Sequence, residues 1–267
     1  MATIEAPQAQ AQAKGGGLAV AGLSVGFVLM WSSGFVGGRL GTQSASTLTL
    51  MSWRFLAILP VAVLLLAFLA RREGGLSPRR WPRQAVVGLG SQVLYLGGVV
   101  GAIELGVSAG TSAIVAALQP LVTGALSGIA LGSRTSRREW RGLAVGFAGV
   151  ALAVGGDLAG GSAPAWAYAL PFVGMLGLVA ATLVEARDPE PIPVVEGLAV
   201  QCATSAVAFT LLAAAAGRLA DPVVAEPAFW GAVAWLIAFS TLGGYGFYWL
   251  TMRRAGATRL SSLVYLT

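Results

Sequence analysis

Long uncharged stretches alternate along the chain with short clusters of charged residues. The first, from Gly15 to Gly38, holds 24 residues without a charge, more than the roughly 20 that a helix needs to cross a bilayer. Continuing along the chain in the same way predicts eight membrane spans in total. They are residues 15–38, 47–70, 84–103, 111–131, 142–156, 165–184, 194–217 and 228–252.

The composition leads to the same class of protein. Of the 267 residues, 56% are hydrophobic and 10% are charged, whereas a soluble domain has about 25% charged residues. A soluble globular enzyme, a disordered chain and a disulfide scaffold are therefore excluded. The 37 glycines suit membrane helices, which associate where small residues let their backbones approach closely. The sequence predicts an all-α polytopic membrane protein.

The net charge of +6 first suggests nucleic acid, but no basic run is interleaved with aromatic residues. The basic residues instead mark one side of the membrane, and the positive-inside rule places the N-terminus in the cytoplasm. Residues 1–17 are then a disordered cytoplasmic tail. This orientation puts 14 of the 17 basic residues inside, namely Lys14, Arg71, Arg72, Arg79, Arg80, Arg83, Arg134, Arg137, Arg138, Arg141, Arg187, Arg253, Arg254 and Arg259.

The chain also repeats itself weakly. A shift of 146 residues places Leu96-Gly97-Gly98 on Leu242-Gly243-Gly244. The shift moves the third span onto the eighth, and a displacement by five helices reverses orientation in the membrane. The turn after the third span carries Glu104 and no base, while the turn after the eighth carries Arg253 and Arg254, as expected for opposite faces. This pattern predicts an inverted repeat of five-helix halves.

Several short motifs, in their order along the chain, resemble EamA-type members of the drug/metabolite transporter superfamily. The resemblance implies ten helices, with a first repeat at 18–157, a second at 158–267, and a substrate cavity between them. It implies export of small metabolites, amino acids or drug-like compounds across the bacterial inner membrane. The motifs are Trp31-Ser32-Ser33-Gly34-Phe35-Val36, Arg54-Phe55, Ala109-Gly110-Thr111, Leu118-Gln119-Pro120-Leu121, Gly256-Ala257-Thr258-Arg259, Ser261-Ser262-Leu263 and Tyr265-Leu266-Thr267.

The chain departs from the family pattern at Thr267, where family members continue through helix 9 into helix 10. Eight apolar residues from Leu260 rise only about 12 Å as a helix, against a hydrocarbon core of about 30 Å. The second repeat is therefore expected to be incomplete. An alternative function follows, that of a non-transporting or degenerate membrane protein.

The inventory of reactive side chains argues against an enzyme. The chain has no histidine and one cysteine, Cys202, which excludes haem ligation by histidine, the usual zinc sites and Ser-His or Cys-His catalysis. No metal or cofactor is expected. No ATP-binding loop is present either, so an ion or proton gradient, or the gradient of the small-molecule substrate itself, would drive transport.

Polar residues inside the spans are the candidates for the substrate cavity. Arg54 is costly in a bilayer, and either anchors its span at the interface or contacts substrate or coupling ion. Gln92 and Tyr95 share a helix face and either line a cavity or join helices. Gln119 precedes Pro120, which frees the carbonyl of Ala116 and is a hinge candidate.

Aromatic and acidic residues complete the candidates. Trp31 lies deep in the first span and is either an interfacial belt residue or a wall of the cavity. Tyr245 and Tyr248 share a face of the eighth span and either pack helices or stack on the substrate. Solvated loop acids are the simplest interpretation of Glu104, Asp157, Glu185 and Glu196 near helix ends. Glu104 and Glu196 are the first candidates for proton coupling. A homodimer stays open, because small residues occur on every helix.

Overall fold

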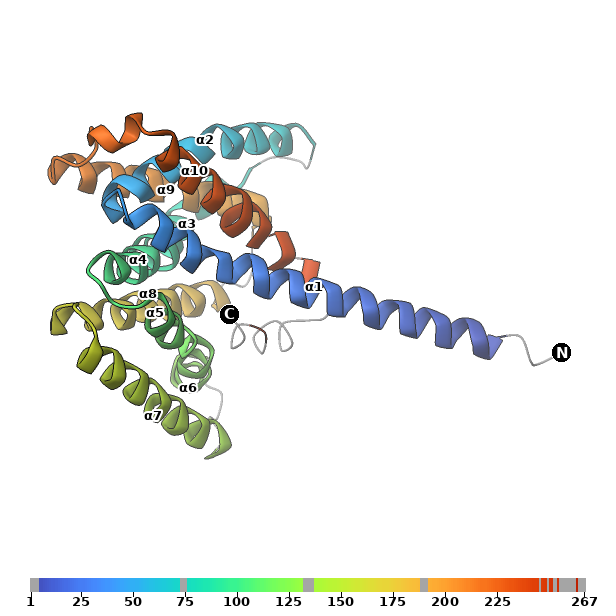
Figure 1. Ribbon diagram of the computed structural model, residues 1–267. Coiled ribbons are helices and arrows are strands. Elements are labelled where there is room, and N and C mark those ends of the chain that lie inside the picture. The colour runs from blue at the N-terminus through green and yellow to red at the C-terminus, as the bar shows by residue number, and fades with distance from the viewer. Residues whose placement is uncertain are drawn as a thin grey trace. The chain divides into compact units, whose positions relative to one another are not determined.

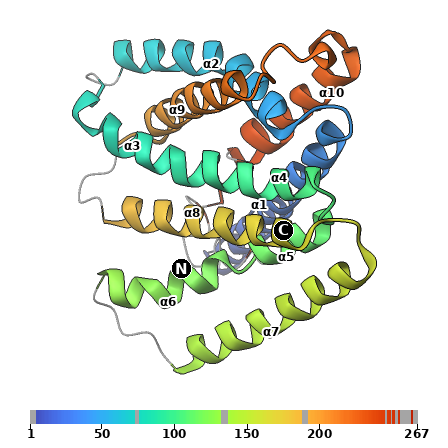
Figure 2. The same cartoon turned by 90° about the vertical axis from the view of Figure 1, so that its left-hand side faces the viewer.

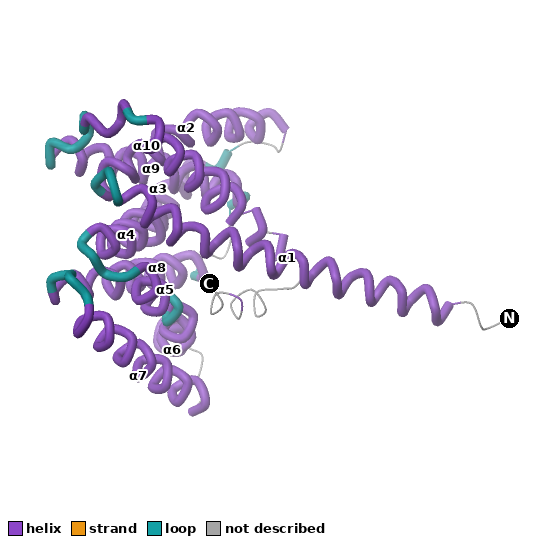
Figure 3. Tube along the Cα trace, in the orientation of Figure 1, coloured by secondary structure: helices purple, strands orange, loops and turns teal. Residues whose placement is uncertain are grey.

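The structure, a computed structural model, consists of helices joined by short loops in the part of the chain that it describes (Figure 1, Figure 3). In these residues, eight helices are long and apolar enough to cross a membrane. The predicted all-α polytopic membrane fold is therefore confirmed. The described residues are 5–72, 76–131, 137–187, 192–244, 246–248, 250–251, 254 and 263.

The helices follow the predicted spans, with some spans divided. The third span contains a π-helical turn, η2, between two α-helices, and the eighth contains another, η5. The α-helices are α1 (Glu5–Thr42), α2 (Thr47–Arg72), α3 (Trp81–Gly88), α4 (Tyr95–Glu104), α5 (Ala109–Ala116), α6 (Gln119–Leu131), α7 (Arg137–Gly160), α8 (Ala169–Ala186), α9 (Val194–Ala215) and α10 (Pro227–Trp235). The short helical turns are η1 (Pro78–Arg80), η2 (Leu89–Leu94), η3 (Ala165–Tyr168), η4 (Pro222–Ala225) and η5 (Leu236–Gly243).

Helices α1 and α7 begin well before the starts that the sequence predicts. Helix α1 starts at Glu5, so most of the stretch expected to be a disordered tail is helical, since its Ala, Gln, Glu and Lys residues are strong helix formers. Helix α7 starts at Arg137 instead of residue 142. Long basic side chains can extend from a helix end toward the membrane surface, so charge alone does not end the helix.

The chain divides into two compact units. One contains residues up to Gly34 and from Leu236 onward, and the other runs from Phe35 to Trp235. These units differ from the predicted halves, which meet between residues 157 and 158. The reason lies in the second unit, where helices of the first half pack on helices of the second half, α2 on α9 and α4 on α8.

Figure 2 shows the packing order within the unit from Phe35 to Trp235. Helix α2 lies beside α9, α9 beside α3, α4 beside α8, α8 beside α6, and α6 beside α7. The apolar core between α5, α6, α7 and α8 is built from branched and thioether side chains. Its fully buried members are Val115, Leu118, Val122, Val150, Met175 and Val179.

Glycines let α4 and α8 approach at backbone distance. A Cβ atom on Gly98 would lie 2.5 Å from the carbonyl oxygen of Leu170 and 3.1 Å from Cα of Gly174. One on Gly177 would lie 2.8 Å from Cβ of Leu94. Such approach is typical of membrane helices, where packing at small residues drives association.

The other unit, described by itself, holds α1 against the segment after Leu236. A Cβ atom on Gly244 would lie 4.0 Å from Cα of Trp31, and one on Gly34 would lie 3.6 Å from Cβ of Ser240. The Thr251 hydroxyl donates to the carbonyl of Leu23 at 3.4 Å. Here too, small residues sit where the helices come closest.

The two π-helical turns carry i to i−5 hydrogen bonds. The backbone N–H of Tyr95 donates to the carbonyl of Gly90 at the end of η2. In η5 the side chain of Thr241 donates to the carbonyl of Leu236 at 3.1 Å. Such turns insert one extra residue into a helix and are frequent at functional sites.

Candidate functional site

Arg54 lies in the interior of the unit from Phe35 to Trp235. Its side chain on α2 is 4% exposed, and its Nη1 is 3.9 Å from Sδ of Met51. Its guanidinium carbon lies 5.4 Å from the ring centroid of Phe55, whose ring stacks on that of Phe209 of α9 at 5.8 Å. The charge thus lies against the ring of Phe55, at the contact of α2 with α9.

Gln92 is equally buried, on η2. It is 2% exposed, and its Oε1 accepts a hydrogen bond from the Ser205 hydroxyl of α9 at 2.8 Å. Its Nε2 lies 3.5 Å from Oε1 of Gln201, one turn earlier on α9. The Gln92 amide therefore joins the third span to the seventh.

The hydrogen bonds continue from Gln201 toward the end of the spans. Nε2 of Gln201 donates to Oε1 of Gln84 at 2.8 Å, and Nε2 of Gln84 donates to Oε2 of Glu185 at 2.9 Å. We call these five side chains, Glu185, Gln84, Gln201, Gln92 and Ser205, the polar row. It connects a partly exposed carboxylate at the end of α8 to a fully buried hydroxyl in α9.

Glu196, a coupling candidate, lies in the first turn of α9 and is 1% exposed. Its Oε1 accepts from the backbone N–H of Ser77 at 2.6 Å and from Nε1 of Trp81 at 2.8 Å. These bonds hold the loop before α3 against α9. Nearby, Arg83 of α3 donates to the carbonyl of Val184.

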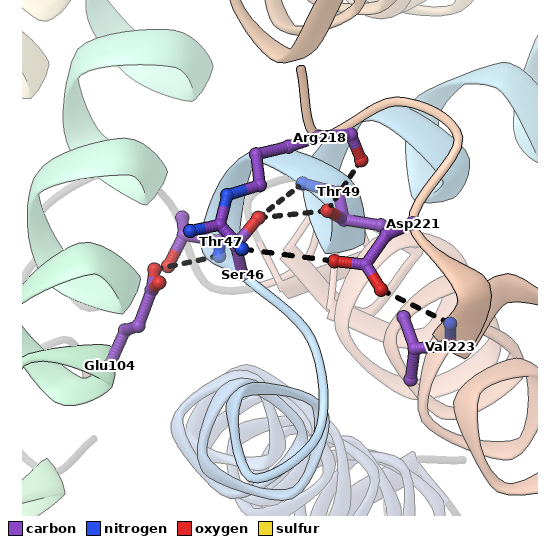
Figure 4. Close-up of polar contacts among 7 residues, drawn as sticks. All are labelled: Ser46, Thr47, Thr49, Glu104, Arg218, Asp221 and Val223. Carbon is purple, nitrogen blue, oxygen red and sulfur yellow. Dashed lines mark hydrogen bonds and ion pairs between the residues drawn. The ribbon is translucent and has the colours of Figure 1, made fainter. Parts of the chain in front are cut away.

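Glu104, the other coupling candidate, lies at the far end of the third span. Its Oε2 accepts from the backbone N–H of Thr47 at 2.7 Å, which satisfies a donor at the start of α2 that no helical carbonyl can reach. Figure 4 shows this contact beside the loop after α9, where the Thr49 hydroxyl donates to the carbonyl of Arg218 at 2.9 Å. The Arg218 guanidinium lies 4.0 Å from the Asp221 carboxylate.

Tyr95 and Gln92 are directed to different neighbours. The ring of Tyr95 is 8% exposed and packs with Val99, Ile103 and Ala116, whereas the Gln92 amide meets α9. Regular α-helical spacing would place Gln92 and Tyr95 on one face of the helix. Gln92 lies inside the π-helical turn and Tyr95 directly after it, so the two side chains point to different neighbours.

Gln119 and Pro120 lie where the fourth span divides. Helix α5 ends at Ala116 and α6 begins at Gln119, so the helix is interrupted directly before the proline. The Gln119 amide lies 3.2 Å from the Thr123 hydroxyl and 3.3 Å from that of Thr182 on α8. This position agrees with the break expected from proline.

Aromatic rings gather in the other unit. The rings of Trp31 and Tyr248 stack at 6.3 Å, and Phe27 lies 5.4 Å from Trp31 and 6.2 Å from Tyr248. Tyr245 lies outside the described residues. So does nearly all of the predicted ninth span, from residue 260 onward, in which only Leu263 is described.

The sequence reasoning missed three members of the polar row, Gln84, Gln201 and Ser205. A signal was present, since Gln201 and Ser205 lie four residues apart in a largely apolar span and so share a helix face. Glu185 was interpreted as a solvated loop acid, but its carboxylate accepts from Gln84. The described residues contain no group of three His, Cys, Asp or Glu side chains that could hold a metal ion.

Comparison with known proteins identifies the family. The model of the EamA-like transporter family matches residues 18–155, just over half of the chain. The chain belongs to this family. It is therefore a multi-pass membrane transporter, and its family points to transport rather than to enzymatic catalysis.

Curated relatives extend the match over more of the chain. The chain is 29% identical over 242 residues to a protein named uncharacterized inner membrane transporter YedA of Escherichia coli strain K12. The YedA protein of Escherichia coli O157:H7 matches to the same extent. The aligned region covers 89% of this chain and 76% of each relative.

Proposed function

We propose that this chain is a secondary transporter of the bacterial inner membrane that exports small metabolites, amino acids or drug-like compounds by alternating access. Family membership and the inner-membrane relatives support the location and the class. Many carriers that work by alternating access are built from two structurally similar halves that move around a fixed site.

Matching helix contacts in the two units support such halves. The contact of Gly98 with Gly174 corresponds to that of Gly244 with Trp31. The contact of Leu94 with Gly177 corresponds to that of Ser240 with Gly34. A shift of 146 residues turns the third-span member of each contact into the eighth-span member, as from Gly98 to Gly244. A shift of 143 residues turns the first-span member into the sixth-span member, as from Trp31 to Gly174.

The π-helical turns obey the same correspondence. A shift of 146 residues moves Leu89–Leu94 onto residues 235–240, which overlap Leu236–Gly243. This coincidence is independent of the glycine contacts, because a π-helical turn depends on the backbone of one helix alone. Together these matches are the observation that carries the proposal of a repeated transporter fold.

We place the polar part of the substrate site at Arg54 and Gln92. Both side chains are almost completely buried in the protein. Ionisable residues such as Arg54 within membrane spans usually mark a substrate or ion path, and Gln92 lies in a π-helical turn, a feature frequent at functional sites. Pro120, at the break between α5 and α6, is proposed as a hinge. In the other unit, taken by itself, Trp31 and Tyr248 are proposed as an aromatic surface that can bind an apolar group.

Export from preloaded cells tests this function. Bacteria expressing the full chain, loaded with radiolabelled amino acids or with ethidium, should lose at least one of these probes faster than cells carrying the empty vector. Gln92→Leu and Arg54→Leu should slow the loss, because each removes a buried polar group from the proposed site. Membrane abundance, measured by immunoblot, should stay within about twofold.

Leu211→Ala is the matched control. Leu211 is 65% exposed on α9, on the helix that carries Gln201 and Ser205, so its truncation should leave export unchanged. Loss of the probes no faster than with empty vector, across the whole panel, contradicts a transport function for these substrate classes. Normal export by both polar variants would instead show that the site is misplaced. An export rate unaffected by an uncoupler would contradict coupling to a proton gradient.

A further inference from the structure

The three glutamines of the polar row bind through both ends of their amides, which makes the row directional. An amide has an oxygen that accepts and a nitrogen that donates, and a half-turn about its last carbon–carbon bond exchanges them. An ionised carboxylate only accepts. Glu185 therefore requires the nitrogen of Gln84, whose oxygen then requires the nitrogen of Gln201.

The same rule continues to the buried end of the row. The oxygen of Gln201 faces the nitrogen of Gln92 at 3.5 Å, the longest and so the weakest step. The oxygen of Gln92 then accepts from the Ser205 hydroxyl. Each amide is thus oriented by its neighbour, and the first neighbour is a titratable carboxylate.

Ser205 allows the opposite direction as well. Its oxygen lies 2.8 Å from Oε1 of Gln92 and also 2.8 Å from the backbone carbonyl of Gln201. A hydroxyl has one proton to donate, so only one of these acceptors is served at a time. If the Gln92 nitrogen faced Ser205, the hydroxyl would accept from it and donate to the Gln201 carbonyl.

We propose that Glu185 is a proton-binding site whose occupancy reverses the polar row and turns the Gln92 amide over. The inference deepens the proposed function, since Gln92 is placed there in the substrate site. A substrate group that donates hydrogen bonds would be favoured by one orientation of Gln92, and a group that accepts them by the other.

The reversal is balanced in protons and breaks no covalent bond within the glutamines. One proton from solution binds the Glu185 carboxylate, and the resulting O–H donates to Oε1 of Gln84. The Gln84 nitrogen then donates to Oε1 of Gln201, and the Gln201 nitrogen to Oε1 of Gln92. The Gln92 nitrogen donates to Ser205, whose hydroxyl proton turns to the Gln201 carbonyl. Deprotonation of Glu185 restores the first arrangement.

Among the residues that the structure describes, few charged groups lie on the elements packed against α8. Helix α3 provides Arg83, which donates to the carbonyl of Val184 next to Glu185. Glu104 is at the opposite end of the third span, and η2, η3, α5 and α6 have no charged residue. Arg187 directly follows helix α8, which carries Glu185. Glu196 of α9 accepts from the loop before α3. Glu185 is therefore the one carboxylate among the five side chains of the polar row, where it accepts from Gln84.

Cys202 provides a spectroscopic reporter of the Gln92 amide. It is the single cysteine of the chain, is buried, and its thiol lies within hydrogen-bond reach of the Gln92 side chain. Infrared spectra of the full chain in lipid vesicles therefore contain one S–H stretching band. In the proposed arrangement with Glu185 ionised, the Gln92 nitrogen would face the thiol; after reversal, the Gln92 oxygen would accept from it.

The experiment compares this band at neutral and acidic pH. Acidification should shift it to lower frequency, because a thiol that donates a hydrogen bond has a weaker S–H bond. Glu185→Gln should abolish the pH-dependent shift, since a carboxamide still donates and accepts but does not titrate. Gln84→Met should abolish it too, because the row is cut after its first member.

Glu226→Gln is the matched control, because Glu226 is exposed in the loop before α10 and should leave the shift intact. A band that does not move in the unaltered chain, or that moves equally in Glu185→Gln, overturns the proposal. The readout needs no substrate and no transport. Failed export with a normal shift would therefore count against the proposed function alone, and export without a shift against the relay alone.

Discussion

Replacing Gly98 with alanine tests the packing of α4 on α8. The new methyl group would start 2.5 Å from the backbone carbonyl oxygen of Leu170, and relief requires about 0.9 Å of separation to reach ordinary van der Waals contact near 3.4 Å. The obstacle is backbone, so no side chain can turn away. If the helices separate by 0.5–1 Å, each affected atom pair loses roughly a quarter to a half of its van der Waals attraction.

We expect Gly98→Ala to lower the free energy of unfolding by about 1–3 kcal/mol, the usual range for overpacking. Hydrophobic exclusion does not offset it, because lipid tails are as apolar as the helices. For a protein of this size, about 2 kcal/mol corresponds to roughly 4–8 °C in melting temperature. The melting temperature is measured on the purified chain in detergent, by heating samples and determining by gel filtration how much folded protein remains.

Gly101→Ala is the matched control on the same helix. Its added Cβ would lie 4.0 Å from Cδ1 of Leu170, an ordinary contact, so the variant should melt like the unaltered chain or gain about 0.4–1 kcal/mol from reduced unfolded-state freedom. Equal melting temperatures for Gly98→Ala and Gly101→Ala would refute the backbone contact and the helix pairing derived from it.

Two further predictions concern a helix start and the pairing of α1. Glu104→Ala should lower the free energy of unfolding by about 1 kcal/mol, as lost helix caps do, because it leaves the Thr47 N–H without the acceptor at 2.7 Å. Glu104→Gln retains an acceptor oxygen and should lose less stability in the same melting assay. Equal losses would contradict the capping role. Cysteines at positions 34 and 240, with Cys202→Ala, should form a disulfide on mild oxidation, since their Cβ atoms would be 3.6 Å apart, within the range of natural disulfides. A faster-migrating band on non-reducing gels reports the bond, and a band unchanged by oxidation would contradict the contact of α1 with η5.

The eight spans could be predicted because the signal is local. A charge-free stretch of sufficient length is a property of the sequence alone, and Pro120 marked the interruption between α5 and α6 in the same way. The shift of 146 residues also aligned Leu96-Gly97-Gly98 with Leu242-Gly243-Gly244. Gly98 and Gly244 both lie at helix contacts, each in its own unit.

The polar row could not be predicted in the same way, because partner choice between helices is a tertiary property. Nothing local to Gln84 indicates that its amide joins Glu185 of α8 to Gln201 of α9. The π-helical turn that carries Gln92 lacks a reliable sequence signal as well. For Glu185, nearness to a helix end suggested solvation, whereas the structure supplies a buried donor.

The packing and the chemistry of the two proposed halves differ in how far they repeat. The glycine contacts and the π-helical turns recur under the shift of 146 residues. The polar row does not, since the same shift moves Gln92 onto Ala238 and Gln84 onto Trp230, which have no amide. Contacts that hold helices together are needed in both halves of a repeated fold, whereas a proton-binding relay is needed once. The asymmetry therefore favours a function for the polar row beyond helix packing, which the Glu185→Gln spectra test directly.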